Sequence, residues 1–248
     1  MTIMFISDLH LRPGDPTTHD VFYQLIDTIV PSVESLFILG DLFDLWYGQV
    51  HLDYYQSVLN KLSKTGMHLP IYFLPGNRDF LISHELCQQY NLRRLSEQHR
   101  LALGSNQLLL CHGDDLCQQD RSYQRMRTFV QHRLTTKLFL ALPLSVRQKL
   151  AQLIQTSSQS ACQYKTNQSF DICSQSVDQR LTFNQCNLMI HGHVHQFKHQ
   201  QHNNGRRIVL DSWQPTPNYL TISHDGDIHY YQYDGRHSTL IYQSTCST

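Results

Sequence analysis

The chain has 248 residues, of which 40% are hydrophobic, so it is long and apolar enough for one large domain spanning residues 1–248. Lys and Arg total 20, as do Asp and Glu, and the resulting zero net charge gives no support for binding to nucleic acid. Seven cysteines, an odd number without a C-x-x-C pair, argue against a disulfide framework and a thiolate zinc site and favour the reducing cytoplasm.

Neither a signal peptide nor a membrane span is expected. The start, Met1–Ile6, lacks a basic region and leads directly to Asp8, so it is predicted to be a strand. The most apolar stretch, Leu138–Leu144, has seven residues and includes Pro143. A bilayer span needs about 20 residues.

Five short apolar runs, each followed by a polar block, are predicted to be strands buried on both faces. The runs are Ile3–Ile6, Leu36–Leu39, Ile71–Leu74, Leu108–Cys111 and Leu188–Ile190, and their blocks are Asp8–His10, Gly40–Asp44, Gly76–Asp79, His112–Asp114 and Gly192–His195. Helical patterns lie between several runs, which predicts an α/β fold with a sheet between helices. The blocks would then meet in one cleft at the strand ends.

Residues 121–170, which we call the insertion, separate the fourth and fifth blocks. They include eight basic residues and no acidic one: Arg121, Arg125, Arg127, Arg133, Lys137, Arg147, Lys149 and Lys165. Apolar residues keep helical spacing on both sides of Leu142–Leu144, namely Met126, Phe129, Val130, Leu134 and Leu138, then Val146, Leu150, Leu153 and Ile154. We therefore predict a hairpin of two helices that break at Pro143.

Two basic amphipathic helices beside a cleft favour a lid over an anionic, partly apolar substrate, or a surface that rests on anionic lipid. The plainer alternative is a solvated basic face. Beyond the last block, Asn203–Gly205 is a turn signal between Gln196–His202 and Arg206–Asp211, and Asp225-Gly226 is one between Tyr219–Ile222 and Ile228–Tyr233. The chain is therefore predicted to end in antiparallel strands.

The blocks offer oxygen and nitrogen donors for metal ions. Residues i and i+2 of an extended segment point the same way, so Asp8 with His10, and His193 with His195, are each expected to face one centre. The carboxylate of Asp41 can bridge two cations.

Asn77 adds a carbonyl oxygen and His112 an imidazole. Two divalent ions held by these groups would activate a water for in-line attack on a phosphorus ester. The donor types suit Mn, Fe, Zn or Mg, and their spacing does not choose among these metals. Asp44 is expected to be a loop or cap residue. The histidines outside the blocks are expected on the surface or in turns, among them His132, His199 and His202.

In the forms D-x-H, G-D-x-x-D, G-N-x-x, H-G-D and G-H-x-H, the blocks resemble the calcineurin-like metallophosphoesterase superfamily over residues 8–195. The resemblance implies a β-sandwich flanked by helices, with the insertion as a helical lid. Longer motifs are similar to the UDP-2,3-diacylglucosamine diphosphatases of lipid A biosynthesis: Gly40–Trp46, Gly76–Leu81, and His112–Cys117 followed by Asp120 and Tyr123. That family cleaves the substrate pyrophosphate to UMP and 2,3-diacylglucosamine 1-phosphate (lipid X).

This resemblance implies two Mn²⁺ ions, one held by Asp8, His10, Asp41 and His195, the other by Asp41, Asn77, His112 and His193. It implies substrate contacts from Asn77, Arg78, Asp120, Ser158, Cys162, Lys165 and His193. It also implies a peripheral location on the anionic cytoplasmic face of the inner membrane.

The chain departs from the family at two places. Cys162 replaces the usual Asn, and Gln49-Val50 replaces an acidic pair after Gly48, but neither change affects a predicted metal ligand. Another two-metal phosphoesterase, acting on nucleotides or phosphoproteins, is an alternative, although it has no evident need for the basic insertion. A non-enzymatic binding module is a further alternative. Such modules usually lose ligands, whereas all seven predicted ligands are present here.

Overall fold

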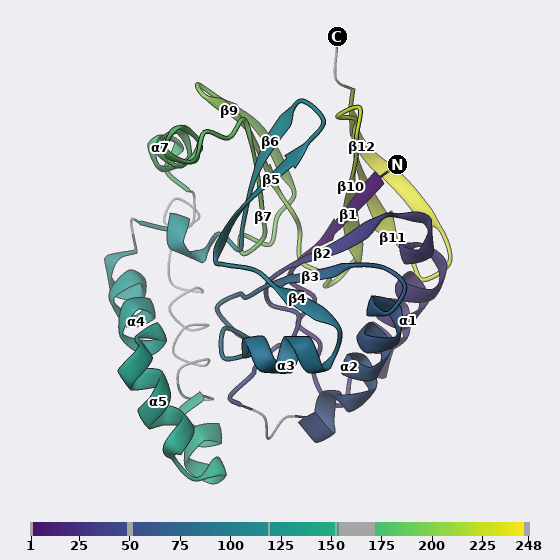
Figure 1. The fold of residues 1–248 in the computed structure, drawn as a ribbon. Coiled ribbons are helices and arrows are strands. Elements are labelled where there is room, and N and C mark those ends of the chain that lie inside the picture. Colours follow the sequence, from purple (N-terminus) through teal and green to yellow (C-terminus); the bar gives the residue numbers. More distant parts are fainter. Residues whose placement is uncertain (1, 49–51, 119, 152, 154–171, 246–248) are drawn as a thin grey trace.

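The computed structural model describes residues 2–48, 52–118, 120–151, 153 and 172–245, and it shows two packed β-sheets with helices around them (Figure 1). One sheet has the order β12-β11-β10-β1-β2-β3-β4. Its strands are β1 (Thr2–Ile6), β2 (Ser35–Leu39), β3 (Ile71–Leu74), β4 (Leu92–Arg94), β10 (Asn218–Ser223), β11 (Ile228–Tyr233) and β12 (Ser238–Ser244).

The second sheet has the order β5-β6-β7-β9-β8. Its strands are β5 (Gln98–Leu103), β6 (Asn106–Cys111), β7 (Leu188–His191), β8 (Lys198–His202) and β9 (Gly205–Val209). The interior between the sheets is apolar because alternate residues of a strand face opposite sides. Phe5 of β1 belongs to one buried cluster with Leu108 and Ile190 of the second sheet, whereas Met4 and Ile6 face the helices.

Helices cover the outer faces of this sandwich. Helices α1 (Pro16–Thr28), α2 (Leu52–Gly66) and α3 (His84–Gln89) pack on the larger sheet, and α7 (Ser174–Asn184) packs on the smaller one through Val177 and Leu181. Helix α1 begins where the carboxylate of Asp15 accepts a hydrogen bond from the Thr18 amide, and Pro16 is its first residue.

The five predicted buried strands are confirmed, but the expectation that they share one sheet is wrong. Strands β1, β2 and β3 belong to the larger sheet, and β6 and β7 to the smaller one. The reason is that β6 pairs antiparallel with β5 in a hairpin and parallel with β7, so these strands form a sheet of their own. Both C-terminal antiparallel pairs, β8–β9 and β10–β11, form as predicted.

The insertion is helical where the structure describes it, but its first part is not one continuous helix. Helix α4 (Arg121–Gln131) ends at His132, whose extended backbone begins α5 (Arg133–Ala141). The ring of His132 accepts a hydrogen bond from the Leu134 amide, which caps α5. Beyond Pro143, residues 144–151 are helical, so the predicted break at Pro143 is present.

Candidate metal centre

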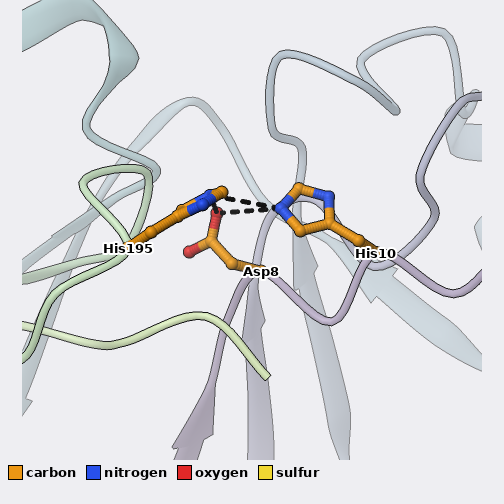
Figure 2. A group of neighbouring side chains, drawn as sticks. All are labelled: Asp8, His10 and His195. Atoms are coloured by element: carbon orange, nitrogen blue, oxygen red, sulfur yellow. Dashed lines mark hydrogen bonds and ion pairs between the residues drawn. The ribbon is translucent and has the colours of Figure 1, made fainter. Parts of the chain in front are cut away.

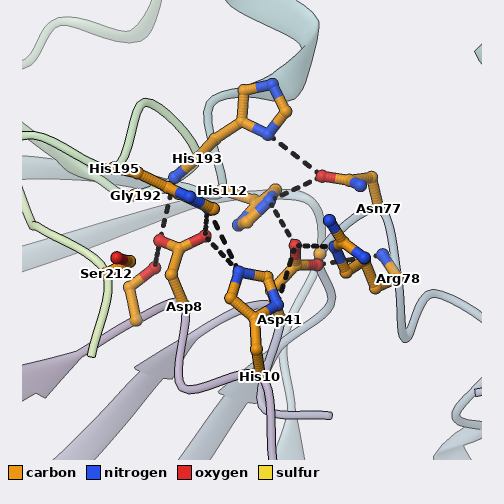
Figure 3. Close-up of polar contacts among 12 residues, drawn as sticks. Asp8, His10, Asp41, Asn77, Arg78, His112, Gly192, His193, His195 and Ser212 are labelled. Carbon is orange, nitrogen blue, oxygen red and sulfur yellow. Dashed lines mark hydrogen bonds and ion pairs between the residues drawn. The ribbon is translucent and has the colours of Figure 1, made fainter. Parts of the chain in front are cut away.

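The polar blocks of both sheets converge at one edge of the sandwich (Figure 3). Asp8 and His10 follow β1, and Asp41 follows β2. Asn77 follows β3, His112 follows β6, and His193 and His195 follow β7. The candidate ligands therefore come from five strand ends, three in the larger sheet and two in the smaller sheet.

The backbone here is not extended, contrary to the expectation from i and i+2 spacing. Asp8, His10, Asp41, His193 and His195 all have positive φ, between 48° and 68°. Left-handed backbone is unfavourable for residues other than Gly and is retained where the surroundings enforce it. The side chains reach a common centre because the chain turns sharply after each strand.

Asp8, His10 and His195 form the first group (Figure 2). The Nε2 atom of His195 lies 3.1 Å from Asp8 Oδ1 and 3.2 Å from His10 Nε2. The second oxygen of Asp8 accepts hydrogen bonds from the Ser7 hydroxyl and, at 2.9 Å, from the His193 amide. One carboxylate thus links the end of β1 to the turn after β7.

The second group surrounds Asn77. Its Oδ1 atom lies 3.0 Å from His112 Nε2 and 3.0 Å from His193 Nδ1, and His112 Nε2 is 3.6 Å from Asp41 Oδ2. The Nδ1 atom of His112 donates to the carbonyl of Leu39 at 2.9 Å, which directs Nε2 toward the centre. Asp8, Asp41 and His112 also lie close enough to share one ion.

Burial shapes the electrostatics of these groups. It lowers the pKa of His10 to about 3 and that of His193 to about 4, so both rings are neutral at pH 7 and have a lone pair for a metal. It raises the pKa of Asp41 to about 7, with the carboxylates of Asp79 and Asp8 adding to the effect.

His112 and Asp8 respond to their neighbours more than to burial. Burial disfavours a charge on His112, but Asp41 and Asp8 outweigh it and raise the pKa of His112 to about 9. Burial also opposes ionisation of Asp8, yet the hydrogen bond from His195 and the charge of His112 hold the pKa of Asp8 far below its usual value.

These residues fit divalent cations. Among the described residues, the buried Nδ1 atom of His10 has no hydrogen-bond partner, as expected of a group that awaits a ligand. The crowding of Asp8, Asp41 and Asp79 leaves negative charge that a cation would neutralise. Oxygen and imidazole donors of this kind bind Mn, Fe, Zn or Mg.

Arg78 lies at the border of the centre. Its Nη1 atom is 3.2 Å from Asp44 Oδ1, and its Nε atom is 3.6 Å from Asp41 Oδ2. Asp44 lies in a loop, as expected, and forms an ion pair with Arg78. Arg78 lines a cavity of about 500 Å³ together with Asn77.

That cavity lies between the insertion and the rest of the described chain, which we call the body. Its other walls are mostly apolar, from the body (Trp46, Phe80 and Leu81) and from the insertion (Met126, Phe129, Val130, Leu138, Phe139, Leu142 and Leu150).

Among the described residues, no helix combines the length and hydropathy needed to cross a membrane.

Two arginines of the insertion contact residues outside it. In α4, Arg127 donates to Asp114 at 2.6 Å and to Glu97 at 2.9 Å. Arg147 donates to the carbonyl of Tyr47 at 3.2 Å. Arg127 and Arg147 thus have structural partners outside the insertion.

The remaining predicted substrate contacts are only partly visible. The carboxylate of Asp120 caps α4 by accepting a hydrogen bond from the Tyr123 amide at 3.1 Å. Ser158, Cys162 and Lys165 lie outside the described residues, as do Gln49 and Val50.

Among the buried polar residues that sequence reasoning does not single out, Asp79, Asp114 and His191 stand within two positions of a candidate ligand. Asp79 accepts hydrogen bonds from the amides of Gly76 and Leu42, both at 2.8 Å, and so joins two of the blocks. Asp114 anchors α4, and His191 lies directly before Gly192. Asp79 and Asp114 stand inside the motifs, which was the available signal. His202 is buried, and it lies at the β8–β9 turn, which agrees with the expected surface or turn position.

Several named proteins are similar to this chain over most of its length. A protein of Histophilus somni called UDP-2,3-diacylglucosamine hydrolase is 37% identical over 90% of this chain and 96% of its own length. Proteins of the same name from Haemophilus ducreyi and Shewanella pealeana are 38% and 34% identical, over 87% and 91% of this chain and 93% and 96% of their own lengths.

Among solved structures, vacuolar protein sorting 29 of Cryptosporidium parvum matches 99% of this chain and 98% of its own, with a TM-score of 0.51. Its sequence identity is 11%, so the likeness concerns the fold alone. The family model for calcineurin-like phosphoesterases matches residues 1–197, which hold every candidate ligand. The chain therefore belongs to the calcineurin-like phosphoesterase family.

Proposed function

We propose that this protein hydrolyses the pyrophosphate bond of UDP-2,3-diacylglucosamine, giving UMP and 2,3-diacylglucosamine 1-phosphate (lipid X) in lipid A biosynthesis. The relatives that carry this substrate in their name match nearly the whole chain. The observation that carries the proposal is the cavity of about 500 Å³, which has Asn77 and Arg78 at the metal centre and apolar side chains of the insertion along its walls. A diphosphate that bears two acyl chains needs both environments.

The proposed metal centre holds two Mn²⁺ ions in the ligand sets implied by the family. When bound, two such cations lower the pKa of a coordinated water and stabilise charge that grows on the phosphorus oxygens. The protein's own contribution is placement. Asp8 accepts a hydrogen bond from the His193 amide, Asp79 accepts one from the Leu42 amide, and the His112 ring donates one to the Leu39 carbonyl, and these bonds limit the movement of the ligand-bearing loops.

Arg78 is proposed to bind a pyrophosphate oxygen. Its guanidinium is partly exposed, is held by Asp44 and lines the cavity, so its remaining donors are available to an anion. Asn77, which precedes Arg78 in the chain, and His193, whose Nδ1 lies 3.0 Å from Asn77 Oδ1, are proposed as further contacts to the phosphates. Asp120, Ser158, Cys162 and Lys165 are proposed as further substrate contacts on the family resemblance.

The insertion is also proposed to rest on the anionic cytoplasmic face of the inner membrane. Phe129, Leu134 and Leu138 are 68%, 65% and 72% exposed, although they lie on amphipathic helices. Exposed apolar side chains among basic residues suit an anionic lipid surface. Such a location would bring the cavity to a substrate whose acyl chains reside in the bilayer.

The test is release of UMP from UDP-2,3-diacylglucosamine in detergent, with Mn²⁺ and after its removal by a chelator. We expect Mn²⁺-dependent release, and hydrolysis of plain nucleotides and a phosphopeptide at least about 100-fold slower, because neither fills the apolar walls. Equal or faster hydrolysis of nucleotides or phosphopeptide would favour the alternative, a two-metal phosphoesterase of another substrate class.

A further inference from the structure

Two polar side chains are fully buried behind the metal centre, His191 at the end of β7 and Arg207 on β9, with exposures of 0% and 1%. A buried guanidinium is costly unless it is hydrogen-bonded. The Nε atom of Arg207 donates to His191 Nε2 at 2.9 Å, and its Nη1 atom donates to Gln200 of β8 at 2.6 Å.

The arginine fixes the proton position on the histidine ring. A guanidinium can only donate, so His191 Nε2 must accept and the ring proton must be on Nδ1. That Nδ1 atom lies 2.8 Å from the carbonyl oxygen of Gly192, to which it donates. The orientation of the ring and its hydrogen bond to Gly192 thus depend on Arg207.

Gly192 begins the turn that carries two candidate ligands. Its carbonyl also accepts from the Val194 amide at 2.8 Å, and its own amide donates to the carbonyl of His112 at 3.0 Å. His193 and His195, within this turn, have φ of 68° and 56°. Such a conformation persists only where the surroundings hold it.

The ring of His191 also touches the other ligand loop of the smaller sheet. A side-chain carbon at Gly113, whose φ is 110°, would collide with His191 Nδ1. Gly113 directly follows His112. The imidazole therefore lies between the two loops that carry His112, His193 and His195.

We propose that His191 and Arg207 are a positioning pair, which holds the Gly192–His195 turn so that His193 and His195 face the metal ions and thereby sets the metal affinity. Neither residue is expected to touch metal or substrate. The inference rests on the proposed metal centre but not on the identity of the substrate.

The test is the Mn²⁺ dissociation constant of the full-length protein, measured by calorimetry for the wild type, Arg207→Met, His191→Leu and the double variant. We expect each single change to weaken binding by about 10- to 100-fold, as for other residues that orient metal ligands. The double variant should be no weaker than the weaker single variant, because the two residues act together.

The matched control is His202→Gln, which changes a buried histidine of the same sheet at the β8–β9 turn. It should leave the dissociation constant within about twofold of wild type. Circular dichroism of the metal-free variants measures folding separately, since a merely structural role would lower the melting temperature of all variants and leave the metal affinity of the folded fraction unchanged.

Unchanged affinity in both folded single variants, or losses that add in the double variant, would overturn the positioning pair. If both single variants fail to fold, Gln200→Leu replaces them, because it removes only the outer partner of Arg207. It should weaken Mn²⁺ binding by about threefold or more, and an unchanged constant overturns the proposal. Failure of the wild type to bind Mn²⁺ would overturn the metal centre itself as well.

Discussion

Asp41 and His112 illustrate how single residues prepare the centre for a cation. The carboxylate and the ring lie 3.6 Å apart, both almost fully buried. Burial and nearby carboxylates raise the pKa of Asp41 to about 7, while Asp41 and Asp8 overcome burial to raise that of His112 to about 9. A cation near this pair would have to compete with the proton that these shifts favour on His112.

His10→Ala and Asp41→Ala should each abolish turnover while the chain stays folded. Each change removes a candidate ligand at a strand end and no part of the apolar core. Mutation of residues that only orient metal ligands typically lowers metal affinity or activity by about 10- to 100-fold. Loss of a ligand itself should therefore lower kcat/KM by more than about 100-fold. UMP release at limiting Mn²⁺ measures it, with surface His237→Ala, 81% exposed, as the control. Near-normal turnover in either ligand variant would contradict the two-metal assignment.

Metal binding should become tighter as the pH rises. The pKa of His112 is raised from 6.5 to about 9, so its charge stabilises the metal-free fold below pH 6.5, and this stabilisation is lost as the pH rises toward 9. A metal needs the deprotonated Nε2, and its binding releases that proton. We expect the Mn²⁺ dissociation constant to fall by up to about tenfold per unit between pH 7 and 8.5. Calorimetry that gives a pH-independent constant would refute this.

At the scale of elements, α4 is tied to the end of β6 by charge. Asp114 is 5% exposed and Arg127 is 16% exposed, and their 2.6 Å contact joins the helix to the loop that carries His112. The outer partner of Arg127, Glu97, is 56% exposed. One basic residue of the insertion is thus part of a half-buried network.

Arg127→Met should destabilise the protein by about 3 kcal/mol, because it leaves the buried carboxylate of Asp114 without its cation. Glu97→Gln removes only the exposed partner and should cost less than about 1 kcal/mol. Urea unfolding of both variants measures the difference. Equal losses would mean that the inner pair is no stronger than a surface ion pair.

A charge in the apolar cavity should impair hydrolysis of the diacylated substrate more than hydrolysis of a substrate without acyl chains. Phe139→Asp places a carboxylate on the cavity wall, whereas Leu144→Asp changes an exposed residue outside it. Losing contact with two methylenes, at ~0.8 kcal/mol each, corresponds to about tenfold in kcat/KM for the diacylated substrate. A small phosphodiester should be hydrolysed within about twofold of wild type by both variants. Equal losses of kcat/KM on both substrates would contradict the proposal that the cavity binds the acyl chains.

The sequence predicts elements better than it predicts their assembly. Apolar runs such as Ile71–Leu74 are recognisable as strands because burial on both faces needs little more than composition. The division into two sheets depends on long-range pairing, as between Leu108 and Leu188, which local pattern does not encode. The apolar spacing does not reveal the break at His132, because it continues unchanged through this position. The break is held by the hydrogen bond from the Leu134 amide to the His132 ring.

The same limit applies to the candidate site. The blocks that carry the candidate ligands can be identified in the sequence because each places carboxylate, amide or imidazole groups directly after an apolar run. Their left-handed backbone cannot, since Asp and His adopt it only when tertiary contacts require it. The His191–Arg207 contact joins β7 to β9 across 16 positions, so neither residue alone suggests it.

On the scale of the whole molecule, the charge is divided unevenly. The chain has no net charge, yet its insertion has eight basic and no acidic residues, so the remainder is acidic by the same amount. An anionic surface would therefore attract the insertion and repel the body. This polarity would orient the molecule with its cavity toward the lipid.

Binding to vesicles should reflect this polarity. We expect co-sedimentation with vesicles that contain anionic phospholipid, weaker binding to zwitterionic vesicles, and a marked decrease when the salt rises from about 0.05 to 0.5 M, because the Debye length shortens. The double variant Arg121→Gln/Arg125→Gln removes two exposed charges of α4 and should weaken binding. Salt-independent binding, or none, would exclude an electrostatic membrane contact.

The position of β1 has a consequence for synthesis of the protein. This first strand pairs with β2 on one side and with β10, more than 200 residues later, on the other. Asp8 likewise meets His195, 187 positions away, and its carbonyl accepts from the Trp213 amide. A nascent chain from which β10 has not yet emerged can fill neither place. Hydrolytic competence thus arises only after β10 has been synthesised, and a product truncated before β10 would leave an open sheet edge that chaperones and proteases can recognise.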